Sequence, residues 1–224
     1  MKLAGLLPAV LGDRGLARVR DLARAGGIEA DGLDLTAPAA LRPFVVAAVA
    51  AGADGGGAGR PVLAVTATSR EADDLADALG CLLPSGQVAV YPAWDTLPHE
   101  RLYQRSDTVG RRLAVLRRLA HPHAPTGVAT PAGPLRVVVA PVRSVLQPQL
   151  KGLGDLDPVE LRVGGEAGLS DVIRRLTDMA YARVDLVTKR GEFAVRGGIL
   201  DVFPPTDEHP SRVEFWGDEV EEIR

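Results

Sequence analysis

The stretch Arg136-Val-Val-Val-Ala140 decides the fold that we expect for the first two-thirds of the chain. Its apolar residues are continuous rather than alternating, which is typical of a strand buried on both faces of a parallel sheet. Two more strands are predicted before it, at residues 61–65 and 88–91, and helical patterns separate the three. This alternation indicates an α/β domain whose helices cover both faces of a parallel sheet.

Helices are predicted where apolar residues recur at helical spacing. The apolar run over residues 3–11 is expected to form a short amphipathic helix, because it is too short to span a bilayer and lacks a cleavage site. We therefore expect a cytoplasmic protein. The other predicted helices cover residues 16–25, 39–51 (started by Thr36 and Pro38), a segment capped by Ser69, and residues 108–119, capped by Ser106 and Asp107.

The pattern changes near residue 152, where short strand-like segments replace the strand–helix alternation. One helix, over residues 171–179 with Ser170 as its cap, is expected among them. Short strands joined by glycine turns indicate an α+β domain with an antiparallel sheet. We expect domains at residues 1–152 and 153–224, the second truncated on its C-terminal side. Its predicted strands cover residues 159–163, 184–188, 192–195, 199–203 and 212–216.

The composition of the 224 residues excludes several classes of site. One cysteine, Cys81, rules out a disulfide framework and a cysteine-rich zinc site. Nine aromatic residues (2 Trp, 3 Tyr and 4 Phe) make a base-stacking platform a poor explanation. The net charge of −3 and the pI near 5.8 argue against non-specific DNA binding by this chain alone.

A glycine-rich run from Gly52 to Arg60 is the obvious candidate for a phosphate cradle. A P-loop also needs a lysine and a Ser/Thr hydroxyl, and its glycines follow a strand. Here the run precedes its strand, and no lysine occurs between Lys2 and Lys151. We therefore favour a flexible loop over a nucleotide site, and we expect no catalytic, metal or cofactor residue in the chain.

Two polar clusters could each be either a solvated surface or a binding site. His121 and His123 could hold a metal, but they lie among prolines without a cysteine, so a solvated loop is favoured. The predicted helix 108–119 carries four arginines, which favour a solvated or salt-bridged face over a nucleic-acid stripe. A contact with another domain or protein is the remaining alternative for them. The four are Arg111, Arg112, Arg117 and Arg118.

Two segments resemble a family. Residues 91–101, reading Tyr91-Pro-Ala-Trp-Asp-Thr-Leu-Pro-His-Glu-Arg101, and residues 105–119 are similar to the N-terminal module of bacterial transcription-repair coupling factors, the Mfd family. Residues 190–205 and 212–224 are similar both to that family and to the excision-repair helicase subunit UvrB. The likeness extends from about residue 45 to residue 224.

The resemblance implies a degenerate NTPase-like domain followed by a domain that docks onto UvrA. It implies a non-catalytic module that recruits UvrA to RNA polymerase stalled at a DNA lesion, linking transcription to nucleotide excision repair. ATP, Mg²⁺, polymerase and DNA would then be handled by other domains of a longer ATP-driven translocase. In the family the module also packs against the rest of the parent protein, which masks the UvrA surface. No membrane partner is implied.

The resemblance also implies a UvrA-binding site at Arg183, Phe193 and Arg196, whereas UvrB has a further arginine where this chain has Ala194. Guanidinium groups present five donors suited to partner carboxylates, and arginine and aromatics are common interface anchors. Two structural alternatives stay open, an Arg196–Glu192 pair across a turn and a core role for Phe193.

Two other functions stay open. One is a UvrB-like ATP-dependent helicase fragment. The interval between Tyr91 and Ser106, where UvrB carries a tyrosine-rich damage-probing hairpin, is short here and holds only Trp94 and Tyr103 as further aromatics, which speaks against damage probing by this chain. The other is a plain DNA-binding domain, against which the acidic pI speaks.

Overall fold

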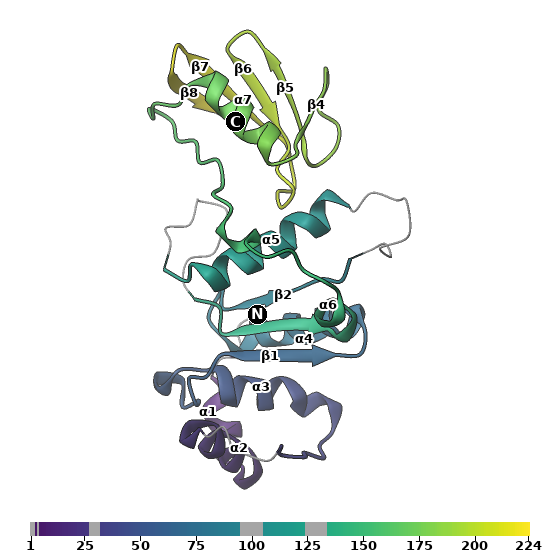
Figure 1. Ribbon diagram of the computed structural model, residues 1–224. Helices are drawn as coiled ribbons and strands as arrows, with labels where there is room; N and C mark the ends of the chain where they lie inside the picture. Colours follow the sequence, from purple (N-terminus) through teal and green to yellow (C-terminus); the bar gives the residue numbers. More distant parts are fainter. Residues whose placement is uncertain (1–2, 4, 27–31, 95–104, 124–133) are drawn as a thin grey trace. The chain divides into compact units, whose positions relative to one another are not determined.

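A computed structural model describes residues 3, 5–26, 32–94, 105–123 and 134–224 (Figure 1). Contacts divide the chain into two compact units. The first consists of residues 1–93 and 115–154, and the second of residues 94–114 and 155–224. Residues 95–101 of the segment 91–101, which carries part of the family resemblance, lie outside the described residues.

The first unit contains a three-stranded parallel sheet in the order β1-β3-β2. Its strands are β1 (Val62–Thr66), β2 (Val88–Val90) and β3 (Val137–Pro141). Val137 pairs with Val62 on one side and with Val88 on the other, so β3 is central, and all five of its residues are buried. The continuous apolar run therefore forms the doubly buried strand that its sequence predicts, and the α/β fold class is confirmed.

The helices surround this sheet, and most match their predicted positions. Asp13 caps α2 by accepting hydrogen bonds from the N–H groups of Gly15 and Leu16, at 2.8 and 3.1 Å. The helices are α1 (Leu6–Val10), α2 (Arg14–Ala25), α3 (Arg42–Ala50), α4 (Ser69–Leu82), α5 (Ser106–Ala120) and α6 (Val142–Leu146), with 3-10 turns η1 (Ala39–Leu41), η2 (Ala53–Gly55) and η3 (Leu153–Asp155).

Successive residues of β3 face opposite sides of the sheet. Val137 and Val139 pack in a core with residues of α1, α3 and α4. Val138 points the other way and packs with Val115 of α5. The predicted cover of helices on both faces is therefore confirmed, with α4 and α5 on opposite sides (Figure 1).

Four predicted helix caps are wrong, and one of them is Ser106 with Asp107, because both residues already belong to α5. Thr68, in an extended conformation, caps α4 by accepting from the N–H of Glu71 at 3.2 Å, and Ser69 is already helical. Helix α3 is preceded by the 3-10 turn η1, so its N-cap is Leu41 rather than Thr36. Gly168, rather than Ser170, occupies the N-cap of the next helix, so Ser170 is already helical.

The second unit contains a five-stranded sheet in the order β4-β5-β6-β7-β8. Its last four strands pair antiparallel, although residues 219–223 were not a predicted strand, and β4 pairs parallel with β5, so the sheet is mixed. Helix α7 (Leu169–Asp178) covers one face through Val172 and Leu176. The strands are β4 (Ala182–Arg183), β5 (Glu192–Arg196), β6 (Ile199–Val202), β7 (Ser211–Trp216) and β8 (Glu219–Ile223).

Two predicted strands do not form. Residues 159–163 run into a turn in which the N–H of Gly165 donates to the carbonyl of Arg162, and Gly164 has a φ of 76°. Residues 185–188 leave the sheet after Val184, whose N–H still bonds β5, and the Glu192 carboxylate binds the N–H groups of Thr188 and Lys189. Side-chain bonds of this kind compete with a strand ladder.

Candidate functional site

A surface hollow of about 510 Å³ lies where β4 ends beside the end of β5. Its lining brings together the two arginines that the resemblance singles out. Both side chains are exposed, and both belong to the second unit. The lining residues are Arg183, Val184, Asp185, Val195 and Arg196. We call this the arginine hollow.

The edge strand β4 positions Arg183. After α7, Ala180 adopts a φ of 63° and the N–H of Tyr181 donates to the carbonyl of Leu176, which turns the chain toward the sheet. The N–H of Ala182 then bonds the carbonyl of Gly191 at 2.8 Å, and that of Val184 bonds Phe193 at 2.9 Å. These bonds fix the backbone on both sides of Arg183.

Arg196 is positioned by its own hydrogen bond. Its Nη2 donates to the backbone carbonyl of Asp185 at 2.7 Å, joining the end of β5 to the loop that follows β4. A guanidinium has four further N–H donors, so this bond orients the group and leaves others available. The predicted alternative, a pair between Arg196 and Glu192, is wrong.

Glu192 instead holds the loop that bounds the hollow. Its carboxylate accepts from the N–H groups of Thr188 and Lys189, at 2.9 and 2.8 Å, and from the Thr188 hydroxyl at 3.3 Å. The two backbone bonds favour the charged form and lower the pKa of Glu192. Consequently the loop that carries Asp185 is tied back to β5.

The arginine hollow carries positive charge. Within the described part of the chain, no carboxylate lies at ion-pair distance from Arg183 or Arg196. The nearby Arg212 differs, because it forms two bonds with the Asp201 carboxylate at 2.6 and 2.9 Å. Two arginines at one hollow are suited to bind carboxylates of a partner.

Phe193 lies in the core of the second unit and not on the surface, where a direct contact with a partner would require it. Its side chain has no exposed area and packs in the second core with Val172 and Leu200. Because a partner cannot contact a side chain without exposed area, the interpretation of Phe193 as a core residue is the one the structure supports. Phe193 supports the sheet beside Arg183, its register partner on β4. Ala194 is also buried, at 3% exposure.

The glycine-rich run forms a loop whose backbone is hydrogen-bonded to the end of α3. The N–H groups of Ala58, Gly59 and Arg60 donate to carbonyls near the end of α3, at 2.8 to 3.0 Å. Arg24 donates to the carbonyls of Gly56 and Gly57. These backbone groups therefore close the end of α3 rather than forming a free cradle for a phosphate.

The arginine cluster of α5 is not a uniformly solvated face. Arg112 is 1% exposed, and its guanidinium carbon lies 4.1 Å from the centre of the Trp94 ring. Arg118 donates a hydrogen bond to the carbonyl of Gly86, and burial lowers its pKa. Arg111 is exposed. At least two of the four arginines thus stabilise the fold, which the sequence pattern did not predict.

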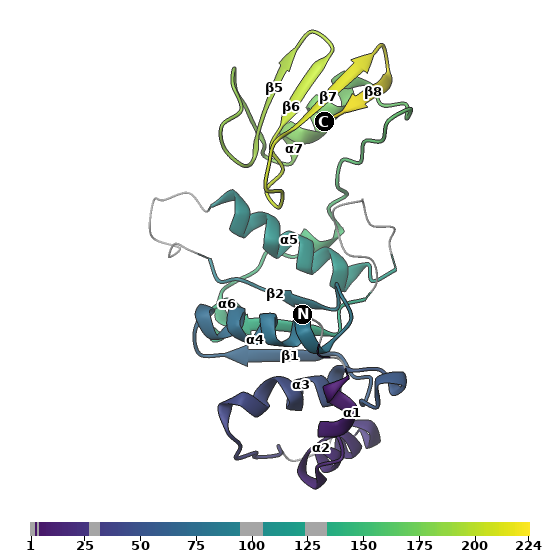
Figure 2. The same cartoon turned by 180° about the vertical axis from the view of Figure 1, so that it is seen from behind.

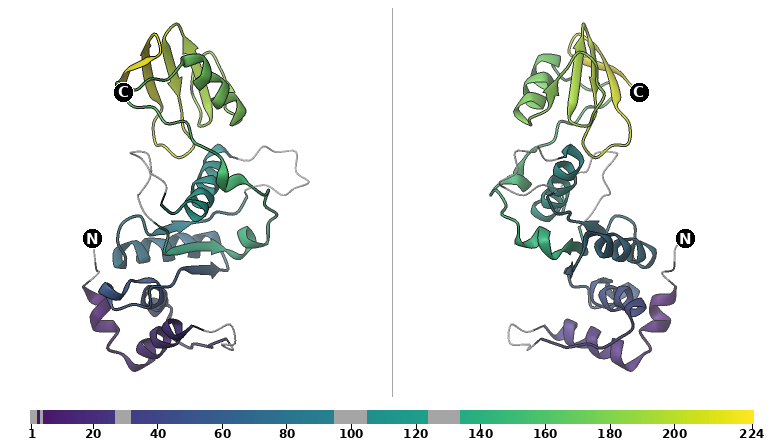
Figure 3. Two further views of the ribbon diagram at one scale, coloured as in Figure 1. Left: turned by 60° about the vertical axis from the view of Figure 1, so that its left-hand side comes forward. Right: turned by 90° about the vertical axis from the view of Figure 1, so that its right-hand side faces the viewer.

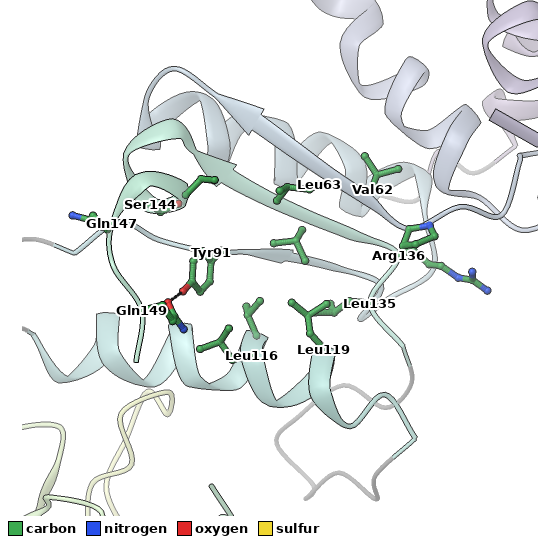
Figure 4. A pocket seen from close by; sticks show the side chains of 14 residues that line it. Val62, Leu63, Tyr91, Leu116, Leu119, Leu135, Arg136, Ser144, Gln147 and Gln149 are labelled. Atoms are coloured by element: carbon green, nitrogen blue, oxygen red, sulfur yellow. Dashed lines mark hydrogen bonds between the residues drawn. The ribbon is translucent and has the colours of Figure 1, made fainter. Parts of the chain in front are cut away.

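An apolar pocket of about 490 Å³ lies in the first unit, between the sheet and α5 (Figure 4). Leu63, Leu116 and Leu119 point into it, and the Tyr91 hydroxyl bonds the side chain of Gln149 at its rim. None of its described lining residues is acidic, histidine or cysteine. Its lining therefore suits packing against apolar groups rather than proton transfer.

Metal-binding clusters and membrane-spanning helices are both absent from the described residues. These residues contain no group of three or more His, Cys, Asp or Glu side chains that could hold a metal ion. None of the helices found among them is long and apolar enough to cross a membrane.

The second unit, which carries the arginine hollow, has a family assignment. Residues 159–224 match the UvrB interaction domain. The transcription-repair-coupling factor of Mycobacterium tuberculosis is 54% identical over 201 residues, which cover 90% of this chain and 15% of that protein. The chain matches the transcription-repair-coupling factors. The predicted resemblance is therefore confirmed.

Other relatives support the same grouping. The transcription-repair-coupling factor of Bacillus subtilis is 31% identical over 165 residues, 74% of this chain and 13% of that protein. The UvrABC system protein B of Geobacillus kaustophilus is 51% identical over 67 residues, 30% of this chain and 10% of that protein. The chain spans about 15% of the length of the mycobacterial coupling factor.

Proposed function

We propose that this chain is a non-catalytic, UvrA-recruiting module of a transcription-repair-coupling factor. The observation that carries the proposal is the arginine hollow, in which Arg183 and Arg196 come from different strands and meet at one surface. Its place within the UvrB interaction domain supports UvrA as the partner. Partner carboxylates would bind the two guanidinium groups.

The module links transcription to nucleotide excision repair by bringing UvrA to RNA polymerase stalled at a lesion. Residues 1–152 form an NTPase-like domain without a working nucleotide site, and residues 153–224 dock onto UvrA. The N–H groups of the glycine-rich run donate to carbonyls of the chain itself, which supports the proposal that residues 1–152 do not bind a nucleotide there. ATP, Mg²⁺, DNA and polymerase are handled by other parts of a longer cytoplasmic parent.

A UvrB-like helicase fragment is the second candidate. The similarity to UvrABC system protein B supports it, but that similarity covers 30% of the chain, against 90% for the coupling factor. Tight ATP binding by this chain, measured by calorimetry, would favour the helicase fragment over the recruiting module.

The proposal is tested by measuring the affinity of purified UvrA for the wild-type chain and for Arg183→Ala with Arg196→Ala. The matched control, Arg162→Ala with Arg174→Ala, removes the same charge from exposed arginines of the same unit. We expect the double variant at the hollow to bind at least about tenfold more weakly, as for interface arginines elsewhere, and the control to bind as wild type. Equal weakening by both pairs would show that only net charge matters and would refute the hollow as the site.

A further inference from the structure

In the described part of the second unit, one face of the sheet packs on α7 and the opposite face carries exposed side chains. Helix α7 packs on one side of it, in front of the strands in Figure 1 and behind them in Figure 2. Both views of Figure 3 show the same one-sided cover by α7. Side chains of β5 to β7 that alternate away from the core form what we call the open face. They include Arg196, Ile199, Asp201, Arg212, Glu214 and Trp216.

Trp216 is the unusual member of the open face. Val213 and Phe215 point into the core, so the alternation of β7 turns Trp216 outward. Its side chain is 80% exposed, more than any other large apolar residue in the described part of the chain. An exposed aromatic of this size on a folded domain is a common interface anchor, because it buries much apolar area with few rotatable bonds.

Two ion pairs lie on the open face near Trp216, and the acidic Glu219 of β8 is the register partner of Trp216. Arg212 binds Asp201, and Arg224 binds Glu214, so these four side chains add little net charge near the indole. Arg196 has no carboxylate partner among the described residues and lies in the cross-strand row Arg196–Ile199–Glu214. Trp216 follows Glu214 by two residues on the same face, which makes the open face continuous with the arginine hollow.

We propose that Trp216 is a second anchor of the same partner-binding surface, and this inference rests on the proposed function. The partner, UvrA, would meet the arginine hollow with carboxylates and the indole with an apolar recess. A binding core of arginine and tryptophan beside paired charges fits the anatomy of interfaces, in which desolvated aromatic and arginine residues contribute most of the affinity.

The direct test uses fluorine NMR on chain labelled with 5-fluorotryptophan and unlabelled UvrA. The chain has two tryptophans, so Trp216→Phe assigns the two resonances. We expect UvrA to shift or broaden the Trp216 resonance well beyond that of Trp94. We also expect Trp216→Ala to weaken UvrA binding at least about tenfold, while Leu146→Ala, which truncates a side chain of 78% exposure in the first unit, binds as wild type.

The outcomes separate this inference from the proposed function. If UvrA binds and depends on Arg183 and Arg196, but neither the Trp216 resonance nor the Trp216→Ala affinity changes, the second anchor is refuted and the recruiting function stands. If UvrA does not bind the wild-type chain, both fail. A shift of Trp216 with a single-stranded oligonucleotide and none with UvrA would assign the indole to base stacking and overturn the inference. A thermal unfolding curve like that of wild type verifies that Trp216→Ala is folded.

Discussion

The guanidinium of Arg196 donates a 2.7 Å hydrogen bond to the backbone carbonyl of Asp185. This bond connects the end of β5 to the loop after β4, and thereby holds the two arginines of the hollow on one surface. Arg183 is held by backbone bonds of an edge strand, and Arg196 by its own side chain. The binding surface thus depends on the local fold as much as on charge.

Replacing Arg196 by lysine keeps the charge and removes the planar fork. A lysine ammonium presents a point charge and cannot make the same pair of bonds to a carboxylate while holding the Asp185 carbonyl. We expect Arg196→Lys to weaken UvrA binding by several-fold to about tenfold at unchanged thermal stability. Surface plasmon resonance and thermal unfolding check the two parts. Wild-type affinity of Arg196→Lys would show that charge alone is recognised.

The Asp201–Arg212 pair makes the stability of the second unit depend on pH in the acid range. The hydrogen bonds from Arg212 lower the pKa of Asp201, so its stabilising contribution is present above the unfolded pKa of about 3.9 and is lost as pH falls through the lower folded value. We expect Asp201→Asn to lower the free energy of unfolding by about 1 kcal/mol at neutral pH. Below about pH 4 the difference from wild type should shrink.

Urea denaturation at neutral and acid pH measures both effects for Asp201→Asn. The control is Asp74→Asn, whose carboxylate is 75% exposed and 4.0 Å from Arg70. A difference between Asp201→Asn and wild type that grows on acidification would contradict the assigned pair.

Truncation of Phe193 tests its place in the core. The side chain is fully buried, so Phe193→Ala removes buried apolar area and leaves a cavity. We expect a loss of about 3–5 kcal/mol in the free energy of unfolding, and a smaller loss for Phe193→Leu. Denaturant unfolding measures both. A Phe193→Ala variant as stable as wild type that loses UvrA binding would mean that Phe193 contacts the partner directly.

The backbone of Gly57 lies so close to the end of α3 that no side chain fits at this position. A Cβ at this position would lie 2.3 Å from the carbonyl oxygen of Ala51. We expect Gly57→Ala to destabilise the chain by about 1–3 kcal/mol, as overpacked sites do. At Gly80 in α4 a Cβ would meet open space, so Gly80→Ala should be neutral or stabilising by up to about 1 kcal/mol. Equal effects of the two variants on the melting temperature would contradict the packed loop.

Much of the fold could be predicted because the sequence patterns that indicate it lie within single strands and helices. The continuous apolar run in β3 requires burial on both faces, and the helical spacing of α5 places Val115 inward. Helix caps were harder, because Thr68 and Ser69 are both good capping residues. Only the extended backbone of Thr68 decides between them.

The candidate site was predicted in part. The predicted strand 184–188 does not form, since residues 185–188 leave the sheet, and Glu192, several residues later, binds the backbone of Thr188 and Lys189. For Phe193 the signal was available, since alternation along β5 places Phe193 and Val195 on one face and Arg196 on the other. The hydrogen bond from Arg196 to the carbonyl of Asp185 forms only because a two-residue edge strand pairs parallel with β5. A strand this short has no residue periodicity from which it could be predicted.

The most direct test of the central claim is hydrogen–deuterium exchange of the chain with and without UvrA. Binding at the arginine hollow should slow exchange in the exposed loop of residues 184–190, which bounds the hollow. The glycine-rich run of residues 52–60 in the first unit should exchange equally in both samples. Protection of residues 52–60 without any change at residues 184–190 would contradict the account.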